Sequence, residues 1–172
     1  GEIRVNLSAL LIVGNLTTAD LIGNGVWLLL KHPEELAKLK ADPSLAAATV
    51  EEILRYESPV AITNRVISEE REVGGCPMHV HQSVITSLHG ANRDPEVFED
   101  PDRFDITRKH VPHVAFGGGS HICIGAPLAR IEAKQALVRL FERFPGLHLA
   151  GYEPTWRASP FFRGMEALVV AG

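Results

Sequence analysis

Cysteine is scarce in this sequence of 172 residues, where Cys76 and Cys123 are the only two. Two cysteines do not make the disulfide framework of a small secreted domain, so a reducing compartment is expected. Charge of one sign is lacking too, because 17 basic and 21 acidic side chains are interspersed and leave a net charge of −4. This balance gives no electrostatic indication of binding to nucleic acid or to an anionic membrane surface. No basic segment followed by a short apolar run opens the chain, so no signal peptide is expected.

An uninterrupted apolar run long enough to cross a bilayer is also missing. The stretch from about Ile3 to Leu30 is strongly apolar, but polar residues break it: Asn15, Thr17, Thr18, Asp20 and Asn24. The stretch therefore predicts one long, buried helix of a soluble protein, and no membrane span. Such a helix needs cover on nearly all faces, and the remaining residues are few for that task. We expect the chain to be a piece of something longer, since it already begins in this helix.

The rest of the chain predicts a mainly α fold with small β-sheets. Amphipathic helices are expected at 32–43 and 45–56, and another at 127–144, which Pro145 and Gly146 end. Short strands are expected at 60–67, 73–76 and 80–88, with Gly74 and Gly75 as a turn. Residues 90–104 predict a proline-punctuated meander on the surface. The tail through 161–162 and 168–170 predicts a hairpin.

What is present in excess is glycine around one sulfur, in "FGGGSHICIG" from Phe116 to Gly125. Cys123 lies just before a helix, and the positive end of the helix dipole favours a thiolate over a thiol. Glycines let the backbone approach a large flat group without Cβ clashes. A single thiolate without further cysteines at metal-cage spacing suits an axial ligand to haem iron better than structural zinc. The alternative is a buried cysteine in a glycine loop.

The pattern Phe116-x-x-Gly119-x-His121-x-Cys123-x-Gly125 resembles the haem-binding loop of cytochrome P-450. The resemblance implies haem b with Cys123 as the thiolate ligand of the iron. The residues expected to contact the cofactor are Cys123, His121, Arg65, Phe116, Gly117, Gly119 and Gly125. Arg65 in "ITNRV" and His121 are placed like the family's two partners of the haem propionates. Without the resemblance, Arg65 reads as an exposed strand cation and His121 as a loop histidine bonded to backbone.

Glu52 and Arg55 are similar to the family's Glu-x-x-Arg helix, and Arg103 in "DPDRFD" resembles the third member of its buried ion network. The spacing is physically sensible, because residues three apart share one helix face. A second arginine would satisfy the remaining carboxylate lone pairs, as a buried charge requires. A solvated helix pair is the alternative.

"VGNLTT" resembles the family's oxygen-binding kink. Gly14 and a Thr hydroxyl bonded to the carbonyl one turn earlier would open a groove for O2, with Thr17 and Thr18 beside it. The expected role of Thr17 is that of a hydroxyl donor to O2. Leu16 departs from the family, which usually has an acid there to relay protons, and Asp20 and Asn15 are not obvious substitutes. A small-residue patch for helix packing is the alternative.

The resemblance covers essentially the whole chain and implies the C-terminal portion of the cytochrome P-450 fold. Its parts would be the long distal helix, the Glu-x-x-Arg helix, the meander, the cysteine loop and the proximal helix. Residues 1–172 would be the haem-ligating part of a single larger domain whose N-terminal part is absent. "GAPLAR", Gly125 to Arg130, resembles the soluble bacterial members, which implies a cytoplasmic protein.

The implied activity is insertion of one oxygen atom from O2 into a small or mid-sized apolar substrate. Electrons would come from a ferredoxin or flavodoxin that docks on the cysteine side. Because Leu16 cannot relay protons, a peroxygenase, a nitric-oxide reductase and an isomerase remain alternatives, as does a non-catalytic haem-binding or gas-sensing protein.

Three further groups of residues are candidates for metal ligands, loop side chains or core residues. Cys76, His79 and His81 offer two plausible metal ligands on one strand face but no evident third or fourth. His110 and His113 flank a proline loop and are expected to be solvated. Phe161 and Phe162 are expected in the core; by family analogy they, Val60 to Thr63 and Leu10 to Gly14 are also candidates for substrate contact.

Overall fold

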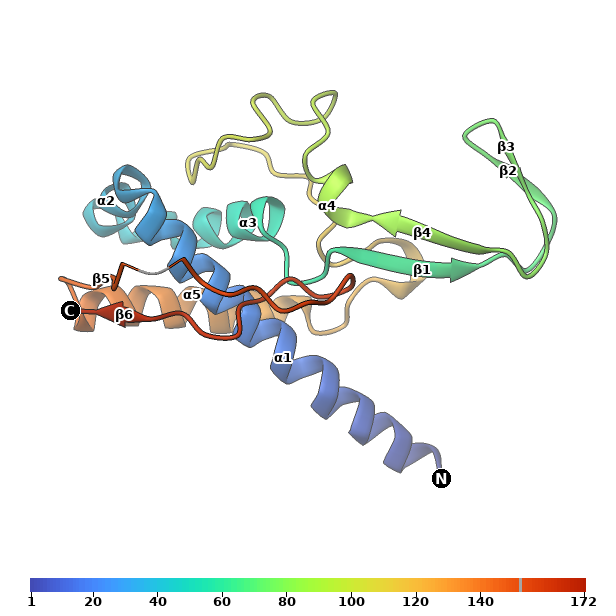
Figure 1. The fold of residues 1–172 in the computed structure, drawn as a ribbon, viewed down its shortest axis with the longest axis horizontal. Helices are drawn as coiled ribbons and strands as arrows, with labels where there is room; N and C mark the ends of the chain where they lie inside the picture. The colour runs from blue at the N-terminus through green and yellow to red at the C-terminus, as the bar shows by residue number, and fades with distance from the viewer. Residues whose placement is uncertain (152) are drawn as a thin grey trace.

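One long helix, α1 (Glu2–Lys31), crosses the molecule, and three shorter helices pack on its C-terminal half (Figure 1). The computed structural model describes residues 1–151 and 153–172. The other helices are α2 (Pro33–Ala41), α3 (Ala46–Tyr56), the short α4 (Leu88–Ala91) and α5 (Ala126–Arg143). Single 3-10 turns occur at Pro43–Leu45 (η1) and Gly119–His121 (η2). The long helices lie within one or two residues of the predicted bounds. Their apolar periodicity indicated the helices, and their prolines indicated where helices begin and end.

The two halves of α1 have different surroundings. Buried residues begin at Asp20, whereas Leu11 and Ile12 are more than 70% exposed, at 76% and 72%. The N-terminal half projects away from the rest of the chain in Figure 1. By length and composition alone α1 could cross a membrane, and 11% of its most apolar window is buried. The expected cover on all faces is therefore supplied only to the C-terminal half.

Close packing of α1, α3 and α5 forms the core. Gly25 lies where α1 meets the other two helices: a Cβ there would come within 2.8 Å of the Ile53 side chain and 3.4 Å of Leu137. A side chain at this position would push the helices apart, so glycine permits the crossing. Leu28, Leu29, Leu54 and Phe141 also belong to this buried cluster.

Among the described residues, six strands form three two-stranded antiparallel sheets. Strand β1 (Ile62–Val66) pairs with β4 (Ser83–Ser87), and β2 (Arg71–Val73) pairs with β3 (Cys76–Met78) at the far end of that ribbon (Figure 1). The predicted turn at Gly74 and Gly75 is confirmed, since both residues have positive φ, 57° and 80°. The predicted strand at 73–76 is not continuous, because Val73 ends β2 and Cys76 begins β3 on either side of that turn.

The hairpin predicted for the tail through 161–162 and 168–170 is confirmed only in part: Trp156 and Met165 form an isolated antiparallel bridge around 161–162, but the end of the tail pairs elsewhere. Strand β6 (Val170–Ala171) pairs with β5 (His148–Leu149), and Phe162 forms an isolated bridge with Val60. The tail thus returns to α5 and to the start of β1. Phe161 and Phe162 are 46% and 37% exposed in the described chain, so the expectation that they lie in the core is wrong.

Candidate cofactor site

The cysteine loop lies between Phe116 and the start of α5. Gly117 and Gly119 have φ values of 72° and 71°, a left-handed conformation that side chains rarely adopt. The N–H of Cys123 donates to the carbonyl of Phe116 at 3.0 Å and closes the loop. Two of the glycines predicted to allow close approach, Gly117 and Gly119, are thus required by the backbone conformation itself.

The surface in front of this loop is open. Cys123 is a free, exposed cysteine, and Ile122 and Ile124 beside it are 60% and 90% exposed. A Cβ on Gly117 or Gly119 would meet no atom within 4 Å, and one on Gly125 would lie 3.8 Å from the Cys123 sulfur. The thiol, the bare glycine backbone and two apolar side chains of this loop are therefore all accessible.

This donor set suits a flat apolar cofactor with a single thiolate ligand. Among residues 1–151 and 153–172, no group of three or more His, Cys, Asp or Glu side chains could hold a metal ion. The carbonyl of Cys123 accepts the N–H of Ala126, the first residue of α5, at 3.3 Å, so the cysteine directly precedes the helix. The residues present fit a haem bound through Cys123.

Arg65 and His121 are both exposed. Arg65 lies on β1, and its guanidinium donates to the carbonyl of Asn64 at 2.9 Å. His121 ends the 3-10 turn of the cysteine loop. Both side chains are accessible to an acidic group, and neither is engaged in an ion pair with the described residues.

Glu52 and Arg55 form a fully buried ion pair on α3. Arg55 donates to both carboxylate oxygens of Glu52, at 2.7 and 2.8 Å. Its three remaining N–H groups reach the carbonyls of Asn92, Pro101 and Arg103 at 2.8–3.1 Å. All five donors of the guanidinium are satisfied, so the pair holds the meander against α3.

The assignment of Arg103 to this network needs correction. Its side chain is 61% exposed and pairs loosely with Asp105, and only its carbonyl reaches Arg55. Arg108 supplies the second guanidinium instead, with Nε 3.3 Å from Glu52 and a side chain 14% exposed. The meander turns Arg103 outward and brings Arg108 back over the carboxylate.

On α1 the hydroxyl of Thr17 donates to the carbonyl of Val13 at 2.7 Å, the bond to the preceding turn that sequence predicted. Since a hydroxyl has one hydrogen, Thr17 can only accept a further hydrogen bond in this conformation, and its expected role as a donor to O2 would require the hydroxyl to turn. Thr17 and Thr18 are partly exposed, and a Cβ on Gly14 would meet nothing within 4 Å. The helix is continuous from Glu2 to Lys31 around these residues.

Leu16 is 39% exposed, and no acid takes its place. Asp20, one turn further along, is 5% exposed and forms an ion pair with Arg157. That pair ties α1 to the C-terminal tail and leaves the Asp20 carboxylate committed to a cation.

His113 is not solvated as predicted; its side chain is 3% exposed. Its Nδ1 accepts the N–H of Ala115 at 3.2 Å, so the proton lies on Nε2, which is 3.0 Å from Glu51. His79, by contrast, is exposed and bonded to Glu70 at 2.9 Å. It shares no metal-binding group with Cys76 and His81.

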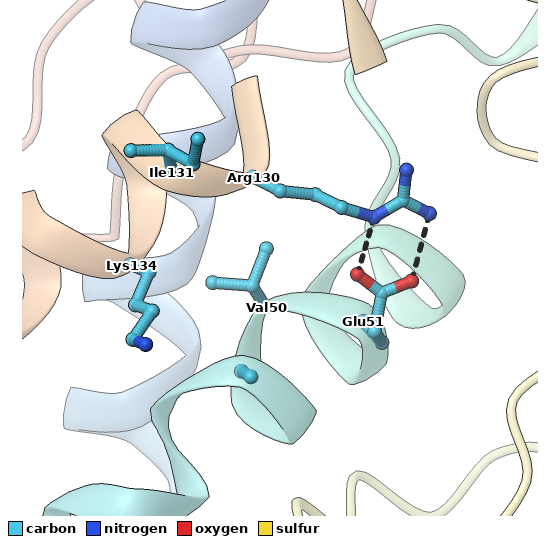
Figure 2. A pocket seen from close by; sticks show the side chains of 6 residues that line it. Val50, Glu51, Arg130, Ile131 and Lys134 are labelled. Atoms are coloured by element: carbon cyan, nitrogen blue, oxygen red, sulfur yellow. Dashed lines mark hydrogen bonds and ion pairs between the residues drawn. The ribbon is translucent and has the colours of Figure 1, made fainter. Parts of the chain in front are cut away.

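Glu51 and Arg130 are a pair that the sequence reasoning missed. Arg130 donates two bonds to the Glu51 carboxylate, at 2.6 and 2.9 Å, beside a cavity of about 120 Å³ (Figure 2). Burial raises the pKa of Glu51, but hydrogen bonds from His113 and Arg130 outweigh it and lower that pKa to about 2. The one signal in the sequence is that Glu51 and Glu52 are adjacent on α3. Adjacent helical residues point in different directions, so Glu51 needs a partner other than that of Glu52.

Comparison with known proteins agrees with this geometry. Residues 1–150 match the family described as Cytochrome P450. The chain is 50% identical over 173 aligned positions to Cytochrome P450 107B1 of Saccharopolyspora erythraea, covering 99% of this chain and 43% of the relative. It is 48% identical to the Biotin biosynthesis cytochrome P450 of Bacillus subtilis, covering 94% of this chain and 41% of that protein.

A solved structure gives the same result in three dimensions. CYP109E1 from Bacillus megaterium in complex with corticosterone superimposes with a TM-score of 0.94 at 39% identity. The match covers 98% of this chain and 46% of that one. The chain thus spans about two-fifths of the length of the curated relatives it matches, and the mainly α fold with small sheets is that of this portion.

Proposed function

Because this chain belongs to the cytochrome P450 family, we propose that its 172 residues are the haem-ligating, C-terminal part of a longer single domain. The whole protein would be a monooxygenase. The share of the relatives that is covered, 41–43%, and the uncovered apolar half of α1 support this division. The observation that carries the function is Cys123, a single exposed thiol in a bare glycine loop at the start of α5.

On its proximal side, haem b would be held entirely by residues of this chain. Cys123 would bind the iron as a thiolate, and Phe116, Gly117, Gly119 and Gly125 would form the wall behind it. Bound through a thiolate, the haem supplies the activation of dioxygen. Arg65 and His121 would pair with the propionates, a role that their exposure permits and that suits a guanidinium.

The distal groove would lie on α1 at Gly14, Thr17 and Thr18. With its hydrogen directed to Val13, Thr17 would accept a hydrogen bond from a water or substrate and orient it. Thr18, one residue on, would contribute its hydroxyl to the same groove.

The substrate would be a small or mid-sized apolar molecule. The solved relative that binds corticosterone supports this class. Exposed apolar side chains of α1 and the tail, such as Leu10, Val13 and Phe161, would contact it. Electrons would come from a ferredoxin or flavodoxin, and two free cysteines fit a cytoplasmic protein.

The test is spectroscopic. The reduced full-length protein with carbon monoxide is expected to show the red-shifted Soret band of thiolate-ligated haem. Cys123→Ser removes that band, while the matched Cys76→Ser leaves it unchanged, because Cys76 lies on the β2–β3 hairpin. A histidine-type band in the wild-type protein contradicts the assignment of the ligand.

Leu16 favours a second candidate within the same haem site: a peroxide-driven oxygenase, a nitric-oxide reductase or an isomerase. Product formed with hydrogen peroxide alone, but not with a reductase and O2, supports a peroxygenase. Tight ligand binding without turnover under any electron supply indicates a haem-binding or gas-sensing protein instead.

A further inference from the structure

We propose that Glu51 is a positioning residue for the cysteine loop, because it holds the segment that enters the loop and the helix that leaves it. The proposal rests on the proposed function, since the loop is the one that carries the haem ligand. Glu51 itself lies on α3, outside the loop, and reaches it only through His113 and Arg130.

On the leaving side, Glu51 fixes Arg130 in the second turn of α5. The two donors of Arg130, Nε and Nη2, bind the two oxygens of Glu51 in the parallel geometry that Figure 2 shows. The guanidinium then lies 4.6 Å from the centre of the Phe116 ring, within cation–π range. Phe116 is the residue whose carbonyl accepts the N–H of Cys123.

On the entering side, Glu51 accepts the Nε2–H of neutral His113, whose Nδ1 in turn accepts the N–H of Ala115. The His113 ring also packs against Phe116, with centroids 6.1 Å apart. Phe116 is therefore flanked by two side chains, His113 and Arg130, that share one carboxylate. No other acid among the described residues bonds both.

The negative charge of Glu51 also lies where it can influence the cysteine loop through Arg130. Hydrogen bonding to Glu51 raises the pKa of Arg130, burial lowers it, and smaller Coulombic contributions from Glu51 and Cys123 raise it further. The Glu51 carboxylate thus balances the positive charge of Arg130, which interacts electrostatically with Cys123. Without Glu51, an uncompensated positive charge would lie beside the loop and weaken electron donation from the sulfur.

The experiment compares three variants of the full-length haem protein with the wild type. Glu51→Gln keeps the shape but removes the charge, and Arg130→Lys keeps the charge but removes the two-pronged geometry. Lys134→Gln is the matched control, because Lys134 lines the same cavity, is exposed and makes no bond to Glu51. The readouts are the haem midpoint potential, the position of the ferrous carbon monoxide band and amide hydrogen exchange across residues 116–125.

Glu51→Gln is expected to shift the midpoint potential to a more positive value and to move part of the carbon monoxide band away from the thiolate position. Exchange in the loop is expected to accelerate by about tenfold, as the loss of charged hydrogen bonds predicts. Arg130→Lys should also accelerate amide exchange in the loop, and Lys134→Gln should match the wild type. Unchanged potential, band and exchange in Glu51→Gln overturn the proposal.

Two other outcomes are separable. If Glu51→Gln does not fold, Arg130→Lys decides alone, and wild-type exchange in that variant overturns the proposal. If the wild type itself lacks a thiolate band, the proposed function fails, while the exchange comparison still tests whether Glu51 positions the loop.

Discussion

Arg55 directs two of its N–H groups to the carboxylate of Glu52 and the other three to carbonyls of the meander. Both side chains are fully buried. A buried pair of this kind is weak evidence for net stability, because desolvation opposes the attraction. Its effect is to fix a segment without regular secondary structure at defined points along α3.

Replacing Arg55 with Lys is expected to destabilise the full-length protein by about 3 kcal/mol or more, since three donors cannot replace five in a buried site. Unfolding in urea with haem absorbance as the probe measures it. A loss below 1 kcal/mol would mean that water replaces the missing donors.

Arg108→Ala and Arg103→Ala distinguish the two candidate arginines. Arg108→Ala removes bonds to Glu52 and to the carbonyls of Glu99 and Asp100, so a loss of about 2 kcal/mol is expected. Arg103→Ala should change stability by less than about 0.5 kcal/mol, because its side chain is exposed and its carbonyl is retained. The reverse order of losses would restore Arg103 to the network.

Gly119→Ala is expected to destabilise the cysteine loop by about 1–2 kcal/mol, because an alanine at φ 71° is strained. Gly118→Ala is the matched control, since Gly118 is extended, with φ −162°. Thermal unfolding of the two variants in the haem-free full-length protein separates backbone strain from contact with the cofactor. Equal losses would contradict the backbone explanation.

The pH dependence of stability should report Glu51. Its pKa of about 2 in the folded protein lies below the ordinary value of 4.5, so the unfolded state binds the proton more tightly. The contribution is therefore complete above about pH 4.5 and is lost as the pH falls toward 2. The difference in unfolding free energy between wild type and Glu51→Gln should be constant near neutrality and shrink through that range; a difference independent of pH would contradict it.

The sequence was most informative where one local pattern decides the structure. The i, i+3 spacing of Glu52 and Arg55 predicts that they share one helix face, and the run of glycines before Cys123 predicts an unusual loop. That the pair is buried followed only from the family resemblance. The choice between Arg103 and Arg108 needs knowledge of the fold, because both follow the same prolines and only the path of the meander decides which side chain turns inward.

The role of His113 could not be predicted for a related reason. Its partner Glu51 is 62 residues away in sequence, and a proline loop is usually solvated. The same limit applies to the tail, where β6 pairs with the distant His148–Leu149. Local propensity gives no information on such non-local pairing.

Leu16→Asp tests what the missing acid costs. If O2-dependent turnover is limited by proton delivery, an acid beside Thr17 should raise it by about a hundredfold, the low end of what a positioned proton donor contributes. We do not expect Asp20 to supply this function in the wild type, because its carboxylate is paired with Arg157. Leu16→Asn controls for polarity without a titratable proton, and peroxide-driven turnover controls for access of substrate. Unchanged turnover of Leu16→Asp with a reductase and O2 would contradict a limiting role for Leu16, since the protein would then deliver protons by another route.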